Sequence, residues 1–173
     1  NEDEGILIAR LRLFDTDNSK ADQKHVELTN CAKLLLEAGV NVDAPDPLGD
    51  EVTTPLTKAI RKRNASLVRL LLEQGANPNV KISEDSDATP LDVACESGNE
   101  EIVKPLLEYG SNPENNDGRM IPSIVVASMK GYHDIVEILA QHGANVDALT
   151  LREDDFDEIT NALAIAVGNE NVE

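Results

Sequence analysis

The chain contains the segment Leu70-Leu71-Leu72-Glu73-Gln74-Gly75-Ala76-Asn77, and closely related segments occur at three other places. These copies, which align with it without gaps, cover residues 34–41, 105–112 and 138–145. The glycines of successive copies are 36, 35 and 33 residues apart. A near-constant period of this length is typical of an array in which one structural unit is repeated.

Each copy predicts the end of an amphipathic helix that is followed by a polar loop. Apolar pairs such as Ile102-Val103 and Ile135-Val136 precede the repeated segment at the spacing that forms one apolar stripe on a helix. The glycine falls just past the last turn, where a residue without Cβ adopts a left-handed conformation at little cost. We therefore expect the segment to be the second helix of each unit.

A first helix is indicated upstream of each second helix. Thr54-Pro55-Leu56 is followed by Ala59, Thr89-Pro90-Leu91 is followed by Ala94, and Ile124 with Ala127 matches more loosely. Proline near a helix start supplies the required backbone angle and gives up only an N–H that has no partner there. The small alanine permits close approach of the two helices of a unit.

These patterns resemble the ankyrin repeat over about residues 33 to 148. The most specific segments are Thr89-Pro90-Leu91-Asp92-Val93-Ala94, Gly98-Asn99-Glu100-Glu101-Ile102-Val103 and Gly143-Ala144-Asn145-Val146-Asp147-Ala148. The resemblance implies an all-α repeat solenoid, built from helix–turn–helix units with hairpin-like finger loops. It also implies that the fingers and first helices form a concave face that binds another protein.

The chain departs from the family pattern at several positions. The histidine that often follows Thr-Pro-Leu is replaced by Thr57, Asp92, Val125 and Ala164, and the fourth unit has Pro122-Ser123 in place of Thr-Pro. These changes put the local capping bonds in doubt. Pro105 stands where the sister segments have leucine or isoleucine, and we expect it to kink the second helix or loosen its first turn.

We interpret residues 1–173 as one ankyrin-repeat domain. Residues 1–44 form an irregular first repeat with an insertion, and residues 45–80, 81–115 and 116–148 form repeats 2, 3 and 4. Residues 149–173 form a partial fifth repeat with an insertion in its acidic finger. Because that repeat lacks its second helix, we expect the chain to be part of a longer protein.

Composition excludes several classes of partner and cellular location. The chain has 15 Lys and Arg against 33 Asp and Glu, and the net charge of −18 repels nucleic acid and anionic lipid. No apolar stretch approaches the roughly 20 residues that span a bilayer. Cys31 and Cys95 form neither a disulfide framework nor a zinc motif. We expect an intracellular protein, cytoplasmic or nuclear.

No motif for catalysis, cofactor binding or metal binding stands out. Asp15-Thr16-Asp17-Asn18-Ser19 has the alternating oxygens of a calcium loop, but Lys20 and Val26 occupy the positions that need glycine and glutamate. Of the three histidines, His25 falls in repeat 1 and His133 and His142 fall in repeat 4, and no serine or cysteine lies in a nucleophile motif. Cys95 is expected to be a small buried apolar side chain. We predict no catalytic residue, no cofactor and no metal.

Acidic residues recur in every predicted finger, and we predict that they form one negative edge that binds a partner. The candidate residues are Asp46, Asp50 and Glu51 in the first finger, Glu84, Asp85 and Asp87 in the second, Asp117 and Arg119 in the third, and Asp154, Asp155, Phe156 and Asp157 in the fourth. Glu114 also belongs to the third finger. The alternative is that these loops are acidic only for solubility. Phe156 is either a mobile loop tip or an apolar anchor.

A basic patch is predicted around the inter-helix turn of repeat 2. Its members are Lys58, Arg61, Lys62, Arg63 and Arg69. The patch either offsets the surrounding acid or is used by a partner.

The sequence thus favours a protein-interaction module for a basic protein segment, such as a histone-like, ribosomal or lysine-rich one. A methyl-lysine reader is disfavoured because an aromatic cage needs several aromatic side chains, and the chain has only two Tyr, two Phe and no Trp. The alternative is a targeting or autoregulatory segment of a larger enzyme, channel or effector protein. An enzymatic function has no motif behind it.

Overall fold

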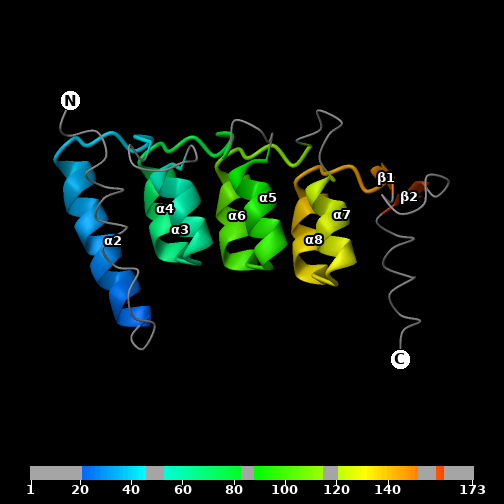
Figure 1. The fold of residues 1–173 in the computed structure, drawn as a ribbon, viewed down its shortest axis with the longest axis horizontal. Helices are drawn as coiled ribbons and strands as arrows, with labels where there is room; N and C mark the ends of the chain where they lie inside the picture. Colours follow the sequence, from blue (N-terminus) through cyan, green and yellow to red (C-terminus); the bar gives the residue numbers. More distant parts are fainter. Residues whose placement is uncertain (1–20, 46–52, 83–87, 115–120, 152–158, 162–173) are drawn as a thin grey trace.

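Seven helices, in two rows, make up most of the computed structural model, which describes residues 21–45, 53–82, 88–114, 121–151 and 159–161 (Figure 1). The first helices of repeats 2, 3 and 4 are α3 (Pro55–Arg61), α5 (Pro90–Ser97) and α7 (Ser123–Met129). The second helices are α2 (Ala21–Glu37), α4 (Ala65–Glu73), α6 (Glu100–Glu108) and α8 (His133–Gln141). Each described first helix packs on the second helix of its own repeat, and helices of the same row pack on each other.

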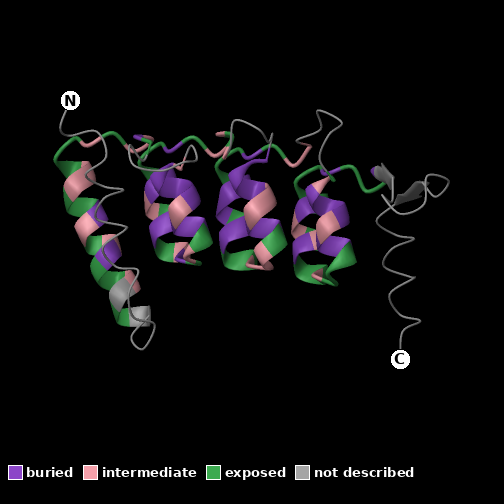
Figure 2. Cartoon of the chain, in the orientation of Figure 1, coloured by how far each residue is buried: buried purple, intermediate pink, exposed green. Residues whose placement is uncertain are grey.

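The core consists of equivalent apolar positions that lie next to one another through the stack. Leu56 of α3, Leu91 of α5 and Ile124 of α7 occupy the same place in their helices, and all three are at most 2% exposed. A second such rank, on the second helices, holds Leu67, Ile102 and Ile135. Full burial of each such side chain contributes about 1.5–3 kcal/mol. In Figure 2 the buried residues, drawn in purple, recur in every helix pair.

The second helices end as the sequence predicts. Gly75, which follows the C-cap Gln74 of α4, has φ +85°, and the N–H of Ala76 donates to the carbonyl of Leu71 at 3.0 Å, as in a Schellman motif. Gly39, Gly110 and Gly143 have the same positive φ after α2, α6 and α8. The all-α repeat solenoid is therefore confirmed.

The capping bonds that the departures put in doubt are present in two repeats. In α3 the hydroxyl of Thr57 accepts from the N–H of Thr54 at 2.9 Å, and the hydroxyl of Thr54 accepts from the N–H of Thr57 at 3.3 Å. In α5 the carboxylate of Asp92 accepts from the N–H and the hydroxyl of Thr89, both at 2.8 Å. Pro122 stands at the N-cap of α7 and provides no such bond. Pro105 does not shorten α6, which has nine residues as α4 and α8 do.

The two ends of the stack differ from its middle. α2 has 17 residues against nine in α4, so a longer helix takes up part of the insertion predicted in the first repeat. The start of that repeat, residues 1–20, lies outside the described residues. At the other end, β1 (Leu149–Leu151) pairs antiparallel with β2 (Ile159–Asn161). The two strands flank the acidic finger predicted for the partial fifth repeat.

Candidate functional site

The bases of the fingers are built from asparagine turns that repeat once per unit. In each turn the side-chain oxygen of an asparagine accepts a hydrogen bond from the backbone N–H two residues further on, which fixes the direction of the loop. The four pairs, each at 3.0 Å, are Asp43 to Asn41, Asn79 to Asn77, Glu114 to Asn112 and Asp147 to Asn145. The repeated asparagine of the sequence pattern therefore has a structural role.

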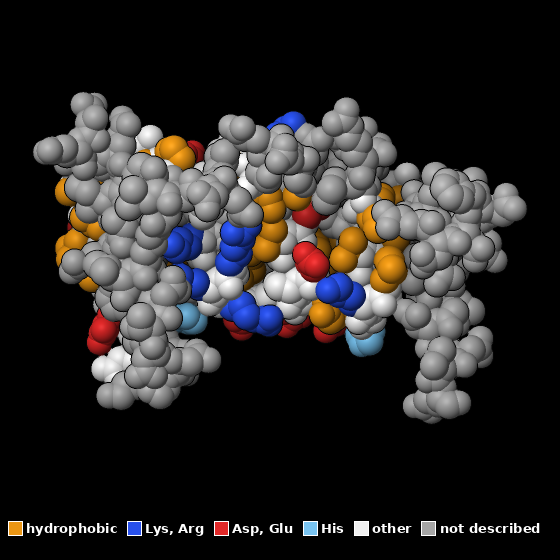
Figure 3. All heavy atoms as spheres, in the orientation of Figure 1, with side chains coloured by type: hydrophobic (Ala, Val, Ile, Leu, Met, Phe, Trp, Pro, Cys, Tyr) orange, Lys and Arg blue, Asp and Glu red, His pale blue; other side chains and the backbone are white. Residues whose placement is uncertain are grey.

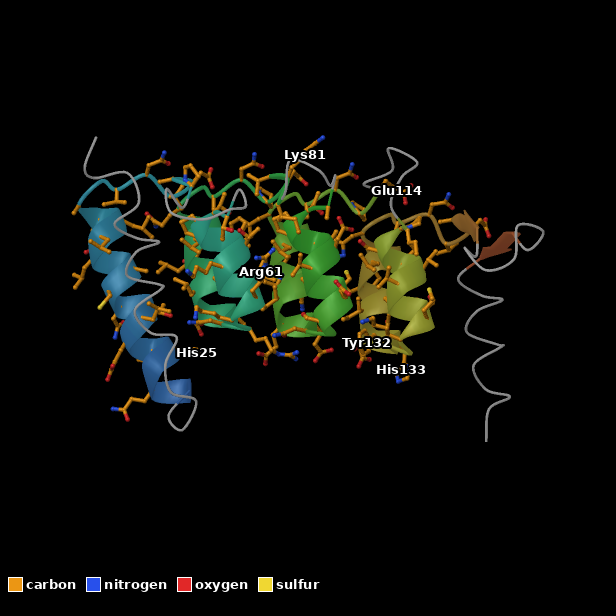
Figure 4. The ribbon with its side chains drawn as sticks, in the orientation of Figure 1. His25, Arg61, Lys81, Glu114, Tyr132 and His133 are labelled. Carbon is orange, nitrogen blue, oxygen red and sulfur yellow. The ribbon has the colours of Figure 1, made fainter. Side chains whose placement is uncertain are left out.

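In three of the four turns, the residue that donates this hydrogen bond also accepts one from the next repeat. The carboxylate of Asp43 accepts from the backbone N–H of Asn77 at 3.1 Å, and the side-chain oxygen of Asn79 accepts from the N–H of Asn112 at 2.8 Å. The carboxylate of Glu114 accepts from the N–H of Asn145 in the same way. We call these bonds the finger ladder. They hold the bases of successive fingers in register along one edge of the stack, where Figure 4 labels Lys81 and Glu114.

The predicted partner-binding residues lie beyond these bases. Asp46, Asp50, Glu51, Glu84, Asp85, Asp87, Asp117, Arg119, Asp154, Asp155, Phe156 and Asp157 are all outside the described residues. Of the acids assigned to the fingers, Glu114 is described, and its carboxylate serves the ladder. The acidic edge thus stays a prediction, whereas the asparagine turns and the finger ladder at the bases of the fingers are described by the structure.

The predicted basic patch divides between the two rows of helices. Lys58 and Arg61 lie on α3, and Lys62 and Arg63 follow it in the inter-helix turn. Arg69 belongs to α4, and its guanidinium lies 3.7 Å from the carboxylate of Glu108 on α6. That ion pair is largely solvated and is worth at most about 1 kcal/mol. Arg69 is therefore not part of the group on the first helices.

Cations from both neighbouring repeats reach the C-terminal end of α5. The guanidinium of Arg63 donates to the carbonyl of Ser97 at 3.0 Å, and the ammonium of Lys130 donates to the carbonyl of Glu96 at 3.2 Å. Carbonyls at a helix C-terminus lack helical partners and carry partial negative charge, so cations stabilise them. These contacts tie repeats 2, 3 and 4 together at the edge opposite the fingers.

The solvent-accessible side of the first helices changes character along the stack. Three equivalent positions in each repeat, two within the first helix and one at its C-terminal end, are half-buried or exposed, and we call them together the first-helix face. They are Lys58, Arg61 and Lys62 in repeat 2, Val93, Glu96 and Ser97 in repeat 3, and Val126, Met129 and Lys130 in repeat 4. In Figure 3 most of the visible Lys and Arg side chains lie over α3, while apolar side chains towards α7 are mixed with a further cation and an acid. The face is therefore cationic in repeat 2, carries the exposed Glu96 in repeat 3, and combines Val126 and Met129 with Lys130 in repeat 4.

A partly buried polar contact joins repeats 3 and 4 beneath this face. The hydroxyl of Ser123 donates to the Asp92 carboxylate at 2.5 Å. Burial and the nearby charge of Asp92 raise the pKa of Cys95 from 9.0 to about 12, although a hydrogen bond with Ser123 lowers it. Cys95 is fully buried, as predicted, and its thiol stays protonated at neutral pH.

The described residues offer little for other chemistry. Among them, no group of three His, Cys, Asp or Glu side chains is placed to hold a metal ion. No helix within the described ranges combines the length and apolar character needed to cross a bilayer. A hollow of about 490 Å³ between α4 and α6 is lined by both signs of charge, including Arg69, Lys104, Glu73 and Glu101. The Asp15 to Ser19 segment lies outside the described residues.

Paired helices stacked in two rows, with laddered loops along one edge, define a helical repeat protein that presents an extended surface. Comparison with family models gives the particular class. A model of three ankyrin repeats matches residues 23–117, and a model of a single ankyrin repeat matches residues 124–151. The chain belongs to the ankyrin-repeat family, whose members are generally protein-interaction modules and typically non-catalytic. A search of curated proteins found no match.

Proposed function

We propose that this ankyrin domain binds a basic segment of another protein through the acidic residues of its fingers and does not itself catalyse a reaction. The observation that carries the proposal is the recurrence of acid in each finger of a chain whose net charge is −18. The finger ladder supports it, because the bases from which these loops extend keep the period of the stack. Carboxylates that recur at that period match an extended target better than scattered surface acids do.

A lysine-rich synthetic peptide serves as the probe, with binding followed by fluorescence anisotropy. Changing Glu84, Asp85 and Asp87 together to lysine is expected to weaken binding tenfold or more. Each exposed charge pair is worth about 0.2–1 kcal/mol, so three in concert reach the 1.4 kcal/mol of a factor of ten. Raising the salt concentration is expected to weaken binding, mainly by slowing association.

The matched control reverses the same number of acids away from the fingers. Glu37, Glu73 and Glu137 are exposed on second helices, and their change to lysine alters the net charge equally. Glu108 is left intact because it pairs with Arg69. Less than a threefold loss is expected from the control. Equal losses from the two triple variants would show that only net charge acts, and the finger proposal would be wrong.

A second candidate is a targeting or autoregulatory segment of a larger enzyme, channel or effector protein. It is favoured by α2, where Val26 and Leu34 are 60% and 66% exposed at the end of the stack. Apolar side chains at that end are available to another part of a longer polypeptide. The sequence flanking residues 1–173 in its source tests this, because a catalytic or membrane domain there would be plain to see.

We also propose that the protein lies inside the cell, in the cytoplasm or nucleus. Both cysteines are free thiols, which fits a reducing compartment. Immunofluorescence of the native protein checks this placement.

A further inference from the structure

We propose that the outer side of the second helices is a self-association surface, on which a second copy of this chain docks with its helices antiparallel to those of the first. The proposal concerns the other row of helices and does not depend on the function proposed for the fingers. Three equivalent positions in each of α2, α4 and α6, helices that pack side by side in one row (Figure 1), form what we call the second-helix face. They are Lys33, Leu34 and Glu37 in α2, Arg69, Leu70 and Glu73 in α4, and Lys104, Pro105 and Glu108 in α6.

Charge on the second-helix face lies in two rows of opposite sign. The first of the three positions is a cation in each helix and the third is an acid, and all six charged side chains are exposed. Four residues advance about 6 Å along a helix, so the two rows run across the stack at about that separation. The face is therefore balanced in charge, although the chain as a whole is strongly acidic.

The acidic row occupies an unfavourable place in its helices. Glu37, Glu73 and Glu108 are the last residues of α2, α4 and α6. Backbone carbonyls carry partial negative charge at a helix C-terminus, which disfavours a carboxylate there. The ion pair between Arg69 and Glu108 offsets this within the chain, but its side chains remain 51% and 39% exposed. These acids gain from a further cation, which the cationic row of a second copy supplies.

The two rows select one of the two principal face-to-face arrangements that a twofold axis allows. An axis along the stack sets each repeat opposite its own counterpart and reverses the helix direction. The cations of one copy then lie over the acids of the other. An axis parallel to the helices keeps their direction and puts cations over cations, which is costly across an interface. The symmetric dimer therefore has antiparallel helices, with Arg69 of each copy facing Glu73 of the other.

Apolar surface between the charged rows is covered in the same arrangement. Leu34 is 66% exposed, and the half-buried Leu70 lines the hollow of about 490 Å³ between α4 and α6. Because the apolar positions lie between the two charged rows, each is close to the axis and faces its own counterpart. Arg69 and Glu73 line the same hollow, so their pairing between copies closes its mouth.

The size of the face sets the strength of the dimer. Nine helical residues span about 13 Å and three packed helices about 30 Å, which gives a footprint of about 400 Å² on each copy. Such an area belongs to weak, transient association, and we expect a dissociation constant on the order of 0.1 mM. The net charge of −18 adds repulsion between copies at long range. The Debye length falls from about 30 Å at 0.01 M salt to about 8 Å at 0.15 M, so the dimer is expected to be stronger at the higher salt.

Sedimentation equilibrium of residues 1–173 tests the proposal, with protein from about 10 μM to about 1 mM to bracket the expected dissociation constant. Arg69→Glu/Lys104→Glu makes the face acidic, and Glu73→Lys/Glu108→Lys makes it basic. Each substitution counts twice in a symmetric dimer, so both variants are expected to self-associate at least about tenfold more weakly than the native chain. The basic variant is decisive, because its smaller net negative charge favours association everywhere except at this face. An equimolar mixture of the two variants is expected to recover the native affinity as a heterodimer.

Two controls match these variants. Arg61→Glu/Lys81→Glu makes the same change of charge at exposed positions outside the face and is expected to weaken the dimer less than about threefold. Leu34→Ser is expected to weaken it about fivefold, because apolar burial is lost in both copies. Val26→Ser changes a side chain on the same helix that is 60% exposed outside the face, and less than a twofold effect is expected. Circular dichroism of every variant checks that the stack stays folded.

A native chain that stays monomeric throughout this range at both salt concentrations would overturn the proposal. Failure of the two charge-reversed variants to associate on mixing would also overturn it. A native dimer that neither variant weakens would use another surface and would equally contradict it.

Discussion

The inter-helix turns of repeats 2 and 3 have the same backbone shape but hold it in different ways. Arg63 in repeat 2 has φ +55°, and Gly98 at the equivalent place in repeat 3 has φ +68°. Left-handed backbone costs a residue with Cβ roughly 1–2 kcal/mol. Arg63 offsets part of this cost by donating to the carbonyl of Ser97 in the next repeat.

Gly98 is constrained from outside its own turn. A Cβ built at Gly98 would lie 2.6 Å from the Cζ of Tyr132, whose ring covers the turn from the next repeat. At Gly131, the equivalent position in repeat 4, a Cβ would meet nothing within 4 Å despite a φ of +70°. The neighbouring repeat, and not the turn alone, decides how strictly glycine is needed.

The largest effect is expected from Gly98→Ala. Left-handed strain of about 1–2 kcal/mol adds to a clash of about 1–3 kcal/mol, so unfolding free energy should fall by about 2–5 kcal/mol. Gly131→Ala should incur only the cost of the left-handed strain. Denaturant unfolding measures both. In a Tyr132→Ala background Gly98→Ala should cost no more than Gly131→Ala, and an undiminished cost there would show that the ring is not the obstacle.

Asp92→Ala should remove a contact that repeat 2 lacks. The variant loses the bonds from Thr89 and leaves the Ser123 hydroxyl without its acceptor, at an expected cost of about 2–3 kcal/mol. Thr57→Ala at the equivalent position of α3 loses only bonds within its own cap and should cost about 1 kcal/mol. Urea titrations compare the two, and a smaller loss for Asp92→Ala would mean that the bond between repeats contributes nothing.

A pH effect should arise from Cys95, which stands where repeat 2 has Ile60. Because the folded pKa is about 12 against 9.0 for the free thiol, the unfolded chain loses its proton first as pH rises. The contribution of the Cys95 thiol to the free energy of unfolding is therefore fully present below pH 9. Between pH 9 and 12 this contribution falls by about 1.4 kcal/mol per pH unit. Cys95→Ala should show a shallower alkaline decline in thermal scans. Identical slopes for the two proteins would contradict the assignment.

The smallest effect is expected from Arg63→Gly. Relief of left-handed strain should slightly exceed the loss of the exposed bond to Ser97 and the greater freedom of glycine when unfolded, for a gain of about 0.5 kcal/mol. Differential scanning calorimetry should show a small rise in Tm. A clear fall would mean that the contact between repeats matters more than the strain.

Much of the fold could be predicted because its signals are local. The four glycines after the second helices and the apolar ranks at Leu56, Leu91 and Ile124 follow from spacing alone. The contacts that build the candidate site are harder to predict from the sequence. The recurring asparagines are visible in the sequence. The hydrogen bonds that Asp43, Asn79 and Glu114 accept from the next repeat, however, join residues more than 30 positions apart. One signal was available: a side-chain acceptor occurs two residues after each asparagine.

The sequence by itself determined the repeat, its two helices and the sign of charge in each loop, because these depend on side-chain type and short-range period. Only the tertiary structure decided that Glu114 serves the ladder, that Arg69 lies apart from Lys58, Arg61 and Lys62, and that Val93, Val126 and Met129 continue the face that those cations begin. Stacking makes neighbours of residues one period apart, and which side of a helix they share depends on how the helices are rotated when they pack.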